Sequence, residues 1–227
     1  MVSKRQPPPE PRRRSVSDEQ KERRRGEILA AALGLLEQQP YDSITMSGVA
    51  AAAGVAKGTT YLYFATREAL FLSLLGEHYA SWFDAFDRRL GMPVPDADAW
   101  AAWVAHELAA RPLFLRLVAV LHAVLEQKVP VAQVLAFKRQ LAWRLLHSGA
   151  ALERVLRLPA GAGSRLLLWL QAIVPGLAQM AAPAPALRAA LAAAPDLNGL
   201  TIDFATELRV LLATTVRGLQ HPSETDS

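Results

Sequence analysis

Hydrophobic residues recur along most of the chain with the spacing of amphipathic helices. In the first such run the apolar positions share one helical face: Ile28, Leu29, Ala32, Leu35 and Leu36. The pattern predicts a helix over 17–39. Ser17 and Gln20 have the spacing of a capping box at its start, and Pro40 ends it.

Two short helical segments are expected next, at about 45–53 and 56–63. Thr45 is a suitable N-cap for the first, because a threonine oxygen accepts hydrogen bonds from the free amides of a first turn. Gly54 stops it, since glycine readily adopts the left-handed conformation that closes a helix. A longer helix, over 66–91, begins at Thr66 and carries a long apolar stripe before the glycine and prolines that follow.

Beyond residue 96 the apolar periodicity predicts further helices at 97–110, 112–127, 130–157, 163–181 and 200–219. Prolines and glycines separate them, including the PAP and APDLNG segments, which we interpret as breaks. Alanine and leucine dominate the composition, and β-branched residues are sparse. The chain is therefore expected to be all-α.

Composition and charge indicate the cellular compartment and the kind of partner. The 227 residues include no cysteine, which excludes disulfides and thiolate metal sites and favours a cytoplasmic protein. The N-terminus lacks the apolar region of a signal peptide, and the most apolar run, from Leu166, is too short for a membrane span. Residues 1–25 hold nine Lys/Arg against four Asp/Glu. That asymmetry fits either an arm that meets a polyanion or a solubilising tail.

The segment GVAKGTTYLYFATREAL, residues 54–70, concentrates hydrogen-bonding and aromatic groups on one turn and helix. Two short helices joined by a glycine turn and braced by a preceding helix form a helix-turn-helix, whose second helix fits the DNA major groove. Lys57 supplies a cation, and Gly58 permits close backbone approach. The remaining candidates are hydroxyl-bearing: Thr59, Thr60, Tyr61 and Tyr63.

The stretch TMSGVAAAAGVAKGTTYLYFATREAL, residues 45–70, resembles the N-terminal DNA-binding signature of the TetR family of bacterial transcriptional regulators. The matching positions are Ala50, Ala53, Gly54, Val55, Gly58, Thr59, Tyr61, Phe64, Glu68 and Leu70. Thr66 replaces the usual serine, Arg67 a frequent lysine, and Thr60 a common aliphatic residue. The resemblance covers about residues 20–75, and beyond them it depends on length and helical pattern.

Residues 1–16 lack an apolar period and are expected to form a disordered basic tail. The resemblance implies a helix-turn-helix domain (17–65) and a helical regulatory and dimerisation domain (66–221) with a connecting helix (66–91). It implies that Thr45, Tyr61, Tyr63 and Arg67 hold phosphates, while Lys57, Gly58 and Thr59 face base edges. Thr60 either packs its methyl group or turns toward DNA. Phe64 is expected in the core, and each tyrosine to pack its ring and expose its hydroxyl.

The family also implies a homodimer and a small-molecule effector. The expected dimer stripes are Leu166, Leu167, Leu170 and Val174, with Phe204, Leu208, Leu211 and Leu212. Candidate effector contacts are Trp100, Trp103, His106, Phe114, His122, Phe137 and Trp143. Core packing is the simpler interpretation of any one of these residues. Few charged residues occur in these helices, which favours an apolar effector.

An enzyme and a nucleoid-type DNA-binding protein are the alternatives to a sequence-specific regulator. The sequence contains no H-E-x-x-H or E-x-x-H spacing for metal ligands, no G-x-S-x-G nucleophile motif and no Walker loop. An enzyme, a metal site and a cofactor are therefore not expected. A nucleoid-type protein that binds DNA without sequence preference is a closer alternative. The groups gathered on residues 56–63 favour a sequence-specific regulator, more often a repressor than an activator.

Overall fold

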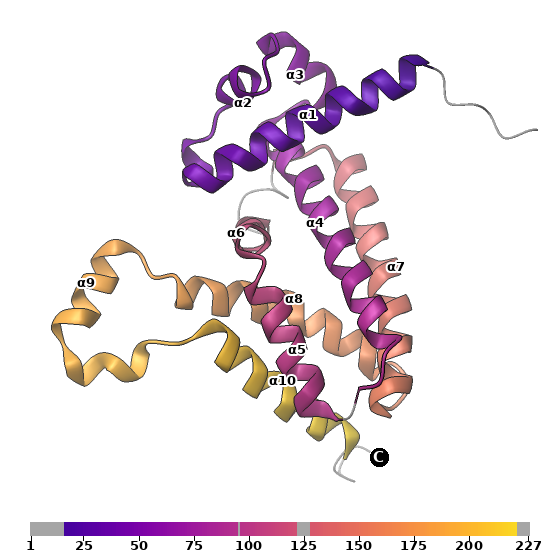
Figure 1. Ribbon diagram of the computed structural model, residues 1–227, viewed down its shortest axis with the longest axis vertical. Coiled ribbons are helices and arrows are strands. Elements are labelled where there is room, and N and C mark those ends of the chain that lie inside the picture. The colour runs from indigo at the N-terminus through magenta and orange to yellow at the C-terminus, as the bar shows by residue number, and fades with distance from the viewer. Residues whose placement is uncertain (1–15, 95, 122–127, 222–227) are drawn as a thin grey trace, which may run out of the picture. The chain divides into compact units, whose positions relative to one another are not determined.

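The computed structural model describes residues 16–94, 96–121 and 128–221 of the chain (Figure 1). Within these ranges the chain is helical and contains no strand, which confirms the all-α prediction. Its contacts divide it into two compact units between Tyr63 and Phe64. The predicted tail, 1–16, lies outside the described residues except for Val16, which is already helical.

The first unit contains a long helix, a 3₁₀ turn and two short helices: α1 (Val16–Gln38), η1 (Tyr41–Ser43), α2 (Met46–Ala52) and α3 (Lys57–Tyr63). Its core comes from the predicted face of α1 and from α2, which pack on each other. Ile28, Ala32 and Val49 are completely buried. The side chain of Ser17, the predicted N-cap of α1, lies outside the described residues.

The second unit begins with α4 (Arg67–Leu90), α5 (Ala97–Ala109), α6 (Pro112–Val120) and α7 (Val131–Leu156). It continues with α8 (Ala162–Ala181), α9 (Pro185–Ala193), η4 (Pro195–Leu200) and α10 (Phe204–Gln220). Thr66 caps α4 as predicted, accepting a hydrogen bond from Ala69 N at 3.0 Å. The second half of the helix predicted over 112–127 lies largely outside the described residues.

Two features near the C-terminus differ from the sequence prediction. The PAP and APDLNG segments do break helices, since α8 ends at Ala181 and α9 ends at Ala193, but α9 itself was not predicted, and the 3₁₀ helix η4 covers most of APDLNG. Pro185 is the first residue of α9, where its missing amide and fixed φ suit a helix start. The last helix begins at Phe204 rather than near residue 200, because Asp203 caps it and accepts a hydrogen bond from Thr206 N at 2.8 Å.

Helices α7 and α8 pack closely where two buried glycines meet. A Cβ built on Gly163 would lie 2.2 Å from the carbonyl oxygen of Gly149. A Cβ on Gly149 would lie 2.5 Å from the backbone nitrogen of Ser164. Only glycine therefore permits this approach of the two helices, whose backbones touch at the crossing.

A polar cluster joins α4 to α7 inside the second unit. Arg144 pairs with Asp84 at 2.7 Å and with Asp87 at 3.4 Å. The buried Ser148 hydroxyl donates to the other oxygen of Asp87 at 2.6 Å. These contacts satisfy the polar groups that α4 and α7 bring together and fix the register of the two helices.

Candidate nucleic-acid interface

The turn between α2 and α3 has the geometry that the sequence predicts. Thr45 caps α2, its Oγ1 accepting a hydrogen bond from Gly48 N at 3.1 Å. Gly54 has φ of +65°, in the left-handed region that glycine favours. The amide of Val55 then returns to the carbonyl of Ala50 at 3.0 Å. The turn is therefore tight, and it starts α3 in a new direction.

Helix α3 has one buried face and one exposed face. Thr60 is 0 % exposed, and its hydroxyl donates to the carbonyl of Lys57 at 2.7 Å. Lys57, Gly58 and Tyr61 are exposed, while Thr59 and Tyr63 are half-buried. The exposed face presents an amine, an open backbone position and a phenol, which are groups that DNA phosphates and base edges can bind.

The structure brings most of the predicted DNA-binding residues together in the first unit. Thr45 is exposed at the start of α2, and five others lie on α3 with side chains or backbone accessible. Arg67 belongs to the second unit, where it pairs with Glu68 at 3.3 Å. The phosphate and base contacts of all these residues stay predictions.

Thr60 requires a correction. Its side chain is buried and its hydroxyl is already bonded to the backbone, so it cannot offer either to DNA in this conformation. Of the two roles open to it, packing is the one that the structure supports. Phe64 is likewise buried, as expected for a core residue.

Leu62 is a candidate that the sequence reasoning missed. It is 85 % exposed on α3, next to the exposed Tyr61. The signal was available, because a residue two positions after Thr60 lies on the opposite side of a helix, so a buried Thr60 places Leu62 outward. An exposed apolar group on a reading helix can contact the methyl group of thymine.

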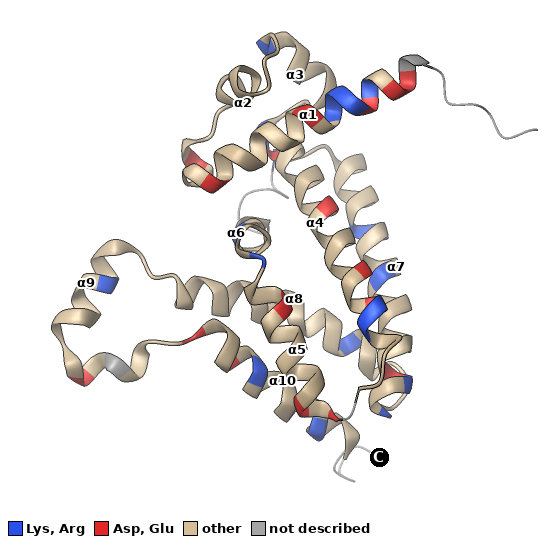
Figure 2. Ribbon diagram, in the orientation of Figure 1, with Lys and Arg blue, Asp and Glu red and all other residues tan. Residues whose placement is uncertain are grey.

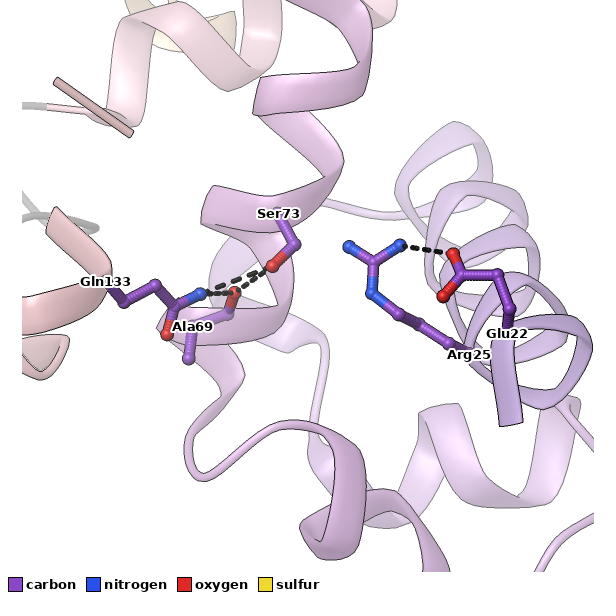
Figure 3. Close-up of polar contacts among 5 residues, drawn as sticks. All are labelled: Glu22, Arg25, Ala69, Ser73 and Gln133. Atoms are coloured by element: carbon purple, nitrogen blue, oxygen red, sulfur yellow. Dashed lines mark hydrogen bonds and ion pairs between the residues drawn. The ribbon is translucent and has the colours of Figure 1, made fainter. Parts of the chain in front are cut away.

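Basic residues also gather on the N-terminal half of α1, in the same unit (Figure 2). Several of them are paired within the helix. Arg24 contacts Glu27 at 2.6 Å, and Arg25 contacts Glu22 at 3.4 Å (Figure 3). Such exposed pairs contribute at most about 0.5 kcal/mol each, so a polyanion can displace them.

The predicted effector contacts are spread over the second unit. Phe114 lines a small cavity of about 20 Å³, together with Tyr79, Trp82, Leu108, Val118, Leu170, Gln171 and Val174. Phe137 lines a second, smaller cavity that shares Tyr79 with the first. Trp82 Nε1 is buried and has no hydrogen-bond partner among the described residues. The Tyr79 hydroxyl donates to Gln171 Oε1.

His78 stands beside this region and stacks on Phe114, with ring centroids 6.2 Å apart. Burial lowers the pKa of His78, Arg111 lowers it further, and Glu77 opposes the shift. The imidazole is therefore held neutral at neutral pH, and it adds no charge next to the cavity.

The other predicted effector contacts line neither of these two cavities. Trp100 is buried elsewhere in the core, and Trp103 is half-buried with its ring 6.1 Å from that of Phe86. His106 is exposed, and Trp143 is exposed and stacks on His147. His122 lies outside the described residues. Tyr79, Trp82 and Gln171 are cavity residues that the sequence reasoning missed.

The predicted dimer stripes face the interior of the protomer, so this prediction is wrong for seven of eight residues. Those seven are buried: Leu166, Leu167, Leu170, Val174, Phe204, Leu208 and Leu212. Only Leu211 is exposed. Both helices carry apolar residues on their outer face as well, namely Leu168, Trp169, Met180, Val210 and Leu211.

Two kinds of site receive no support within the described ranges. No group of three or more His, Asp or Glu side chains there is placed to hold a metal ion. No single described helix is long and apolar enough to cross a membrane; α8 and α9 together meet the length and composition criteria but are bent by 63°.

Solved structures share the fold at low sequence identity. A transcriptional regulator from Streptomyces coelicolor A3(2) superposes with a TM-score of 0.54 at 21% identity, covering 85% of this chain and 98% of that chain. A TetR transcriptional regulator from Rhodococcus sp. RHA1 superposes with a TM-score of 0.54 at 20% identity, covering 89% of this chain and 97% of that chain. FadR from Bacillus subtilis in complex with stearoyl-CoA superposes with a TM-score of 0.51 at 17% identity, covering 87% of this chain and 98% of that chain. No curated protein is significantly similar.

Two family matches cover most of the sequence. Residues 28–74 match the bacterial regulatory proteins of the tetR family, a segment that includes α2, the glycine turn and α3. Residues 76–223 match the tetracyclin repressor-like C-terminal domain. With its helix-turn-helix followed by an all-helical second unit, the chain belongs to the TetR family of transcriptional regulators.

Proposed function

We propose that this chain is a cytoplasmic homodimeric repressor that binds an operator through α3 and leaves it when a small apolar molecule binds the second unit. The observation that carries the DNA-binding part is the division of α3 into two faces. Thr60 anchors the helix by burial, while Lys57, Gly58, Tyr61 and Leu62 point outward together. This leaves a compact surface for a major groove.

Lys57, Gly58, Thr59 and Leu62 are proposed to meet base edges, with Thr45, Tyr61, Tyr63 and Arg67 on phosphates. Footprinting of the intergenic DNA next to its own gene tests this function. A regulator protects a discrete site at fixed salt and prefers it strongly over competitor DNA. A specificity ratio near one favours the nucleoid-type alternative instead.

The dimer is proposed to form through the outer faces of α8 and α10. Leu168, Trp169 and Met180 on α8, with Val210 and Leu211 on α10, expose large apolar groups on two helices that pack side by side. Operators read by helix-turn-helix dimers contain two half-sites about one helical turn apart, so two copies of α3 are required.

Leu168→Glu is expected to separate the subunits, because it places a charge at the centre of an apolar contact. We expect the dimer dissociation constant to rise at least about thirtyfold, corresponding to a hot-spot loss of about 2 kcal/mol. Analytical ultracentrifugation measures it. Leu146→Glu on α7 is the matched control, since Leu146 is also an exposed leucine. A variant that dimerises like the wild type contradicts this interface.

The effector site is proposed to be the cavity beside Phe114. Its lining holds no charged side chain, and its polar groups are the phenol of Tyr79, the indole of Trp82 and the amide of Gln171. Because Trp82 Nε1 is a buried donor that has no acceptor among the described residues, a ligand that accepts a hydrogen bond there regains the free energy of an unmade bond. The cavity has room for about one water molecule, so a ligand must first move α6 from α8.

Such a movement reaches α4 directly. Tyr79 and Trp82 lie on α4, which follows the helix-turn-helix in the chain. The start of α4 is also held by α7: Gln133 Nε2 donates to the Ala69 carbonyl at 2.9 Å and to the Ser73 hydroxyl at 3.2 Å (Figure 3). A ligand that prefers the state with α4 displaced lowers operator affinity by its differential binding, commonly by a factor of about 5–150.

Trp82→Phe is expected to weaken ligands that carry an acceptor by about fivefold, the value of one hydrogen bond of about 1 kcal/mol. Ligand-induced shifts in Tm measure it, with aromatic ketones as the acceptor-bearing probes and the corresponding hydrocarbons as controls. The hydrocarbons should bind the variant and the wild type equally. If ketones lose no affinity, Trp82 does not anchor the effector.

A further inference from the structure

An open groove lies in the helix-turn-helix unit, apart from the exposed face of α3. It has a volume of about 450 Å³ and is lined by Gln20, Lys21, Arg23, Arg24 and Tyr63. Four of these residues come from the first turns of α1, and the fifth is the last residue of α3. The lining therefore contains three cations, an amide and a phenol, and it contains no carboxylate.

The cations of this groove are available to a ligand. Lys21 is exposed, and the described residues provide it with no ion pair. Arg23 and Arg24 share the single carboxylate of Glu27, at 3.7 Å and 2.6 Å. One carboxylate cannot neutralise two guanidinium groups, each of which has five donors. The groove thus keeps a positive charge and several free N–H groups.

Its place relative to α3 indicates which anion fits. Lys57 and Tyr63 are the two ends of α3, about 9 Å apart along the helix axis at 1.5 Å per residue. The major groove is about 12 Å wide. A helix of this length whose Lys57 end meets base edges can place its Tyr63 end at a sugar-phosphate strand, and the α1 cations line the same groove as Tyr63.

We propose that this α1 groove binds backbone phosphates flanking each half-site and thereby extends the DNA contact beyond α2 and α3. Lys21 and Arg24 neutralise the phosphates, while Tyr63 and Gln20 donate hydrogen bonds to them. This inference rests on the proposed function, and it adds affinity without sequence information, since phosphate contacts position a protein and base contacts specify the site.

The test measures how the affinity of the full chain depends on salt. Each phosphate contact contributes about 0.9 to the slope of log K against log salt. For each subunit, the double variant Lys21→Ala/Arg24→Ala should lose about two such contacts, on the footprinted operator and on competitor DNA alike. Lys21 is exposed and Arg24 is half-buried on α1, and alanine favours helices, so the fold is retained. Gln20→Arg should steepen the slope by about 0.9 for each subunit.

Arg188→Ala provides the matched control, because it removes one exposed cation from α9 in the other unit and should leave the slope unchanged. A double variant with the wild-type slope, or with a loss confined to the operator, overturns the α1 groove. The proposed function fails separately, if the wild-type chain itself shows no preference for any operator.

Discussion

Lys57→Ala is expected to reduce operator affinity by a factor of about 5–150, while the dimer and its thermal stability stay as in the wild type. Lys57 is the first residue of α3 and is exposed, so its ammonium is free to reach a guanine edge or a phosphate. A good side-chain contact to a base contributes about 1–3 kcal/mol of discrimination, which is the source of that range. Fluorescence anisotropy with the footprinted duplex measures this loss of operator affinity.

Thr60→Val is the matched control on the same helix. Valine has nearly the shape of threonine, and the lost hydroxyl donates only to the Lys57 carbonyl, so the variant should bind DNA like the wild type. Tyr61→Phe should bind more weakly than the wild type, because the exposed ring loses the hydroxyl that we assign to a phosphate. If Lys57→Ala and Tyr61→Phe both bind normally, α3 is not the reading helix.

Gly163→Ala is expected to lower the free energy of unfolding by about 1–3 kcal/mol, the usual cost of inserting a methyl group into a packed interface. The new Cβ would lie 2.2 Å from the Gly149 carbonyl oxygen, which is backbone and cannot rotate away. Helices α7 and α8 must therefore separate at their crossing. Thermal unfolding should show Tm falling by about 2–4 °C for each kcal/mol.

Gly76→Ala on α4 is the control for this prediction. Its added Cβ would lie 3.9 Å from Phe137 Cδ2, an ordinary van der Waals distance. Alanine is favoured over glycine inside a helix by about 1 kcal/mol, so Tm should stay level or rise. Equal behaviour of the two variants would show that the glycine contact does not limit the packing of α7 on α8.

Local chemistry made the first unit predictable from the sequence. Thr45 and Gly54 act through hydrogen bonds and backbone angles a few residues away, and the structure shows the cap and the left-handed turn where they were expected. The same holds for Thr66 at the start of α4. Thr60 was ambiguous because threonine has both a methyl group and a hydroxyl, and only the packing of α3 decides between them.

The second unit was less predictable because its helices are apolar on more than one face. On α8 the buried Leu170 and the exposed Trp169 are neighbours in sequence, and composition does not tell which one meets the partner. The cavity residues Tyr79 and Gln171 are brought together from α4 and α8 by tertiary packing alone. Helix α9 was missed because proline was interpreted as a break, although it also starts helices.

The central claim is that two copies of α3 read DNA together, and selection of the full-length chain against a random duplex library tests it most directly. Sequencing of the bound duplexes should give an inverted repeat with half-sites about one helical turn, or a multiple of it, apart. Lys57→Ala should lose that preference at the bases facing α3. Bound duplexes without a shared motif, or with a single unrepeated site, would contradict the account.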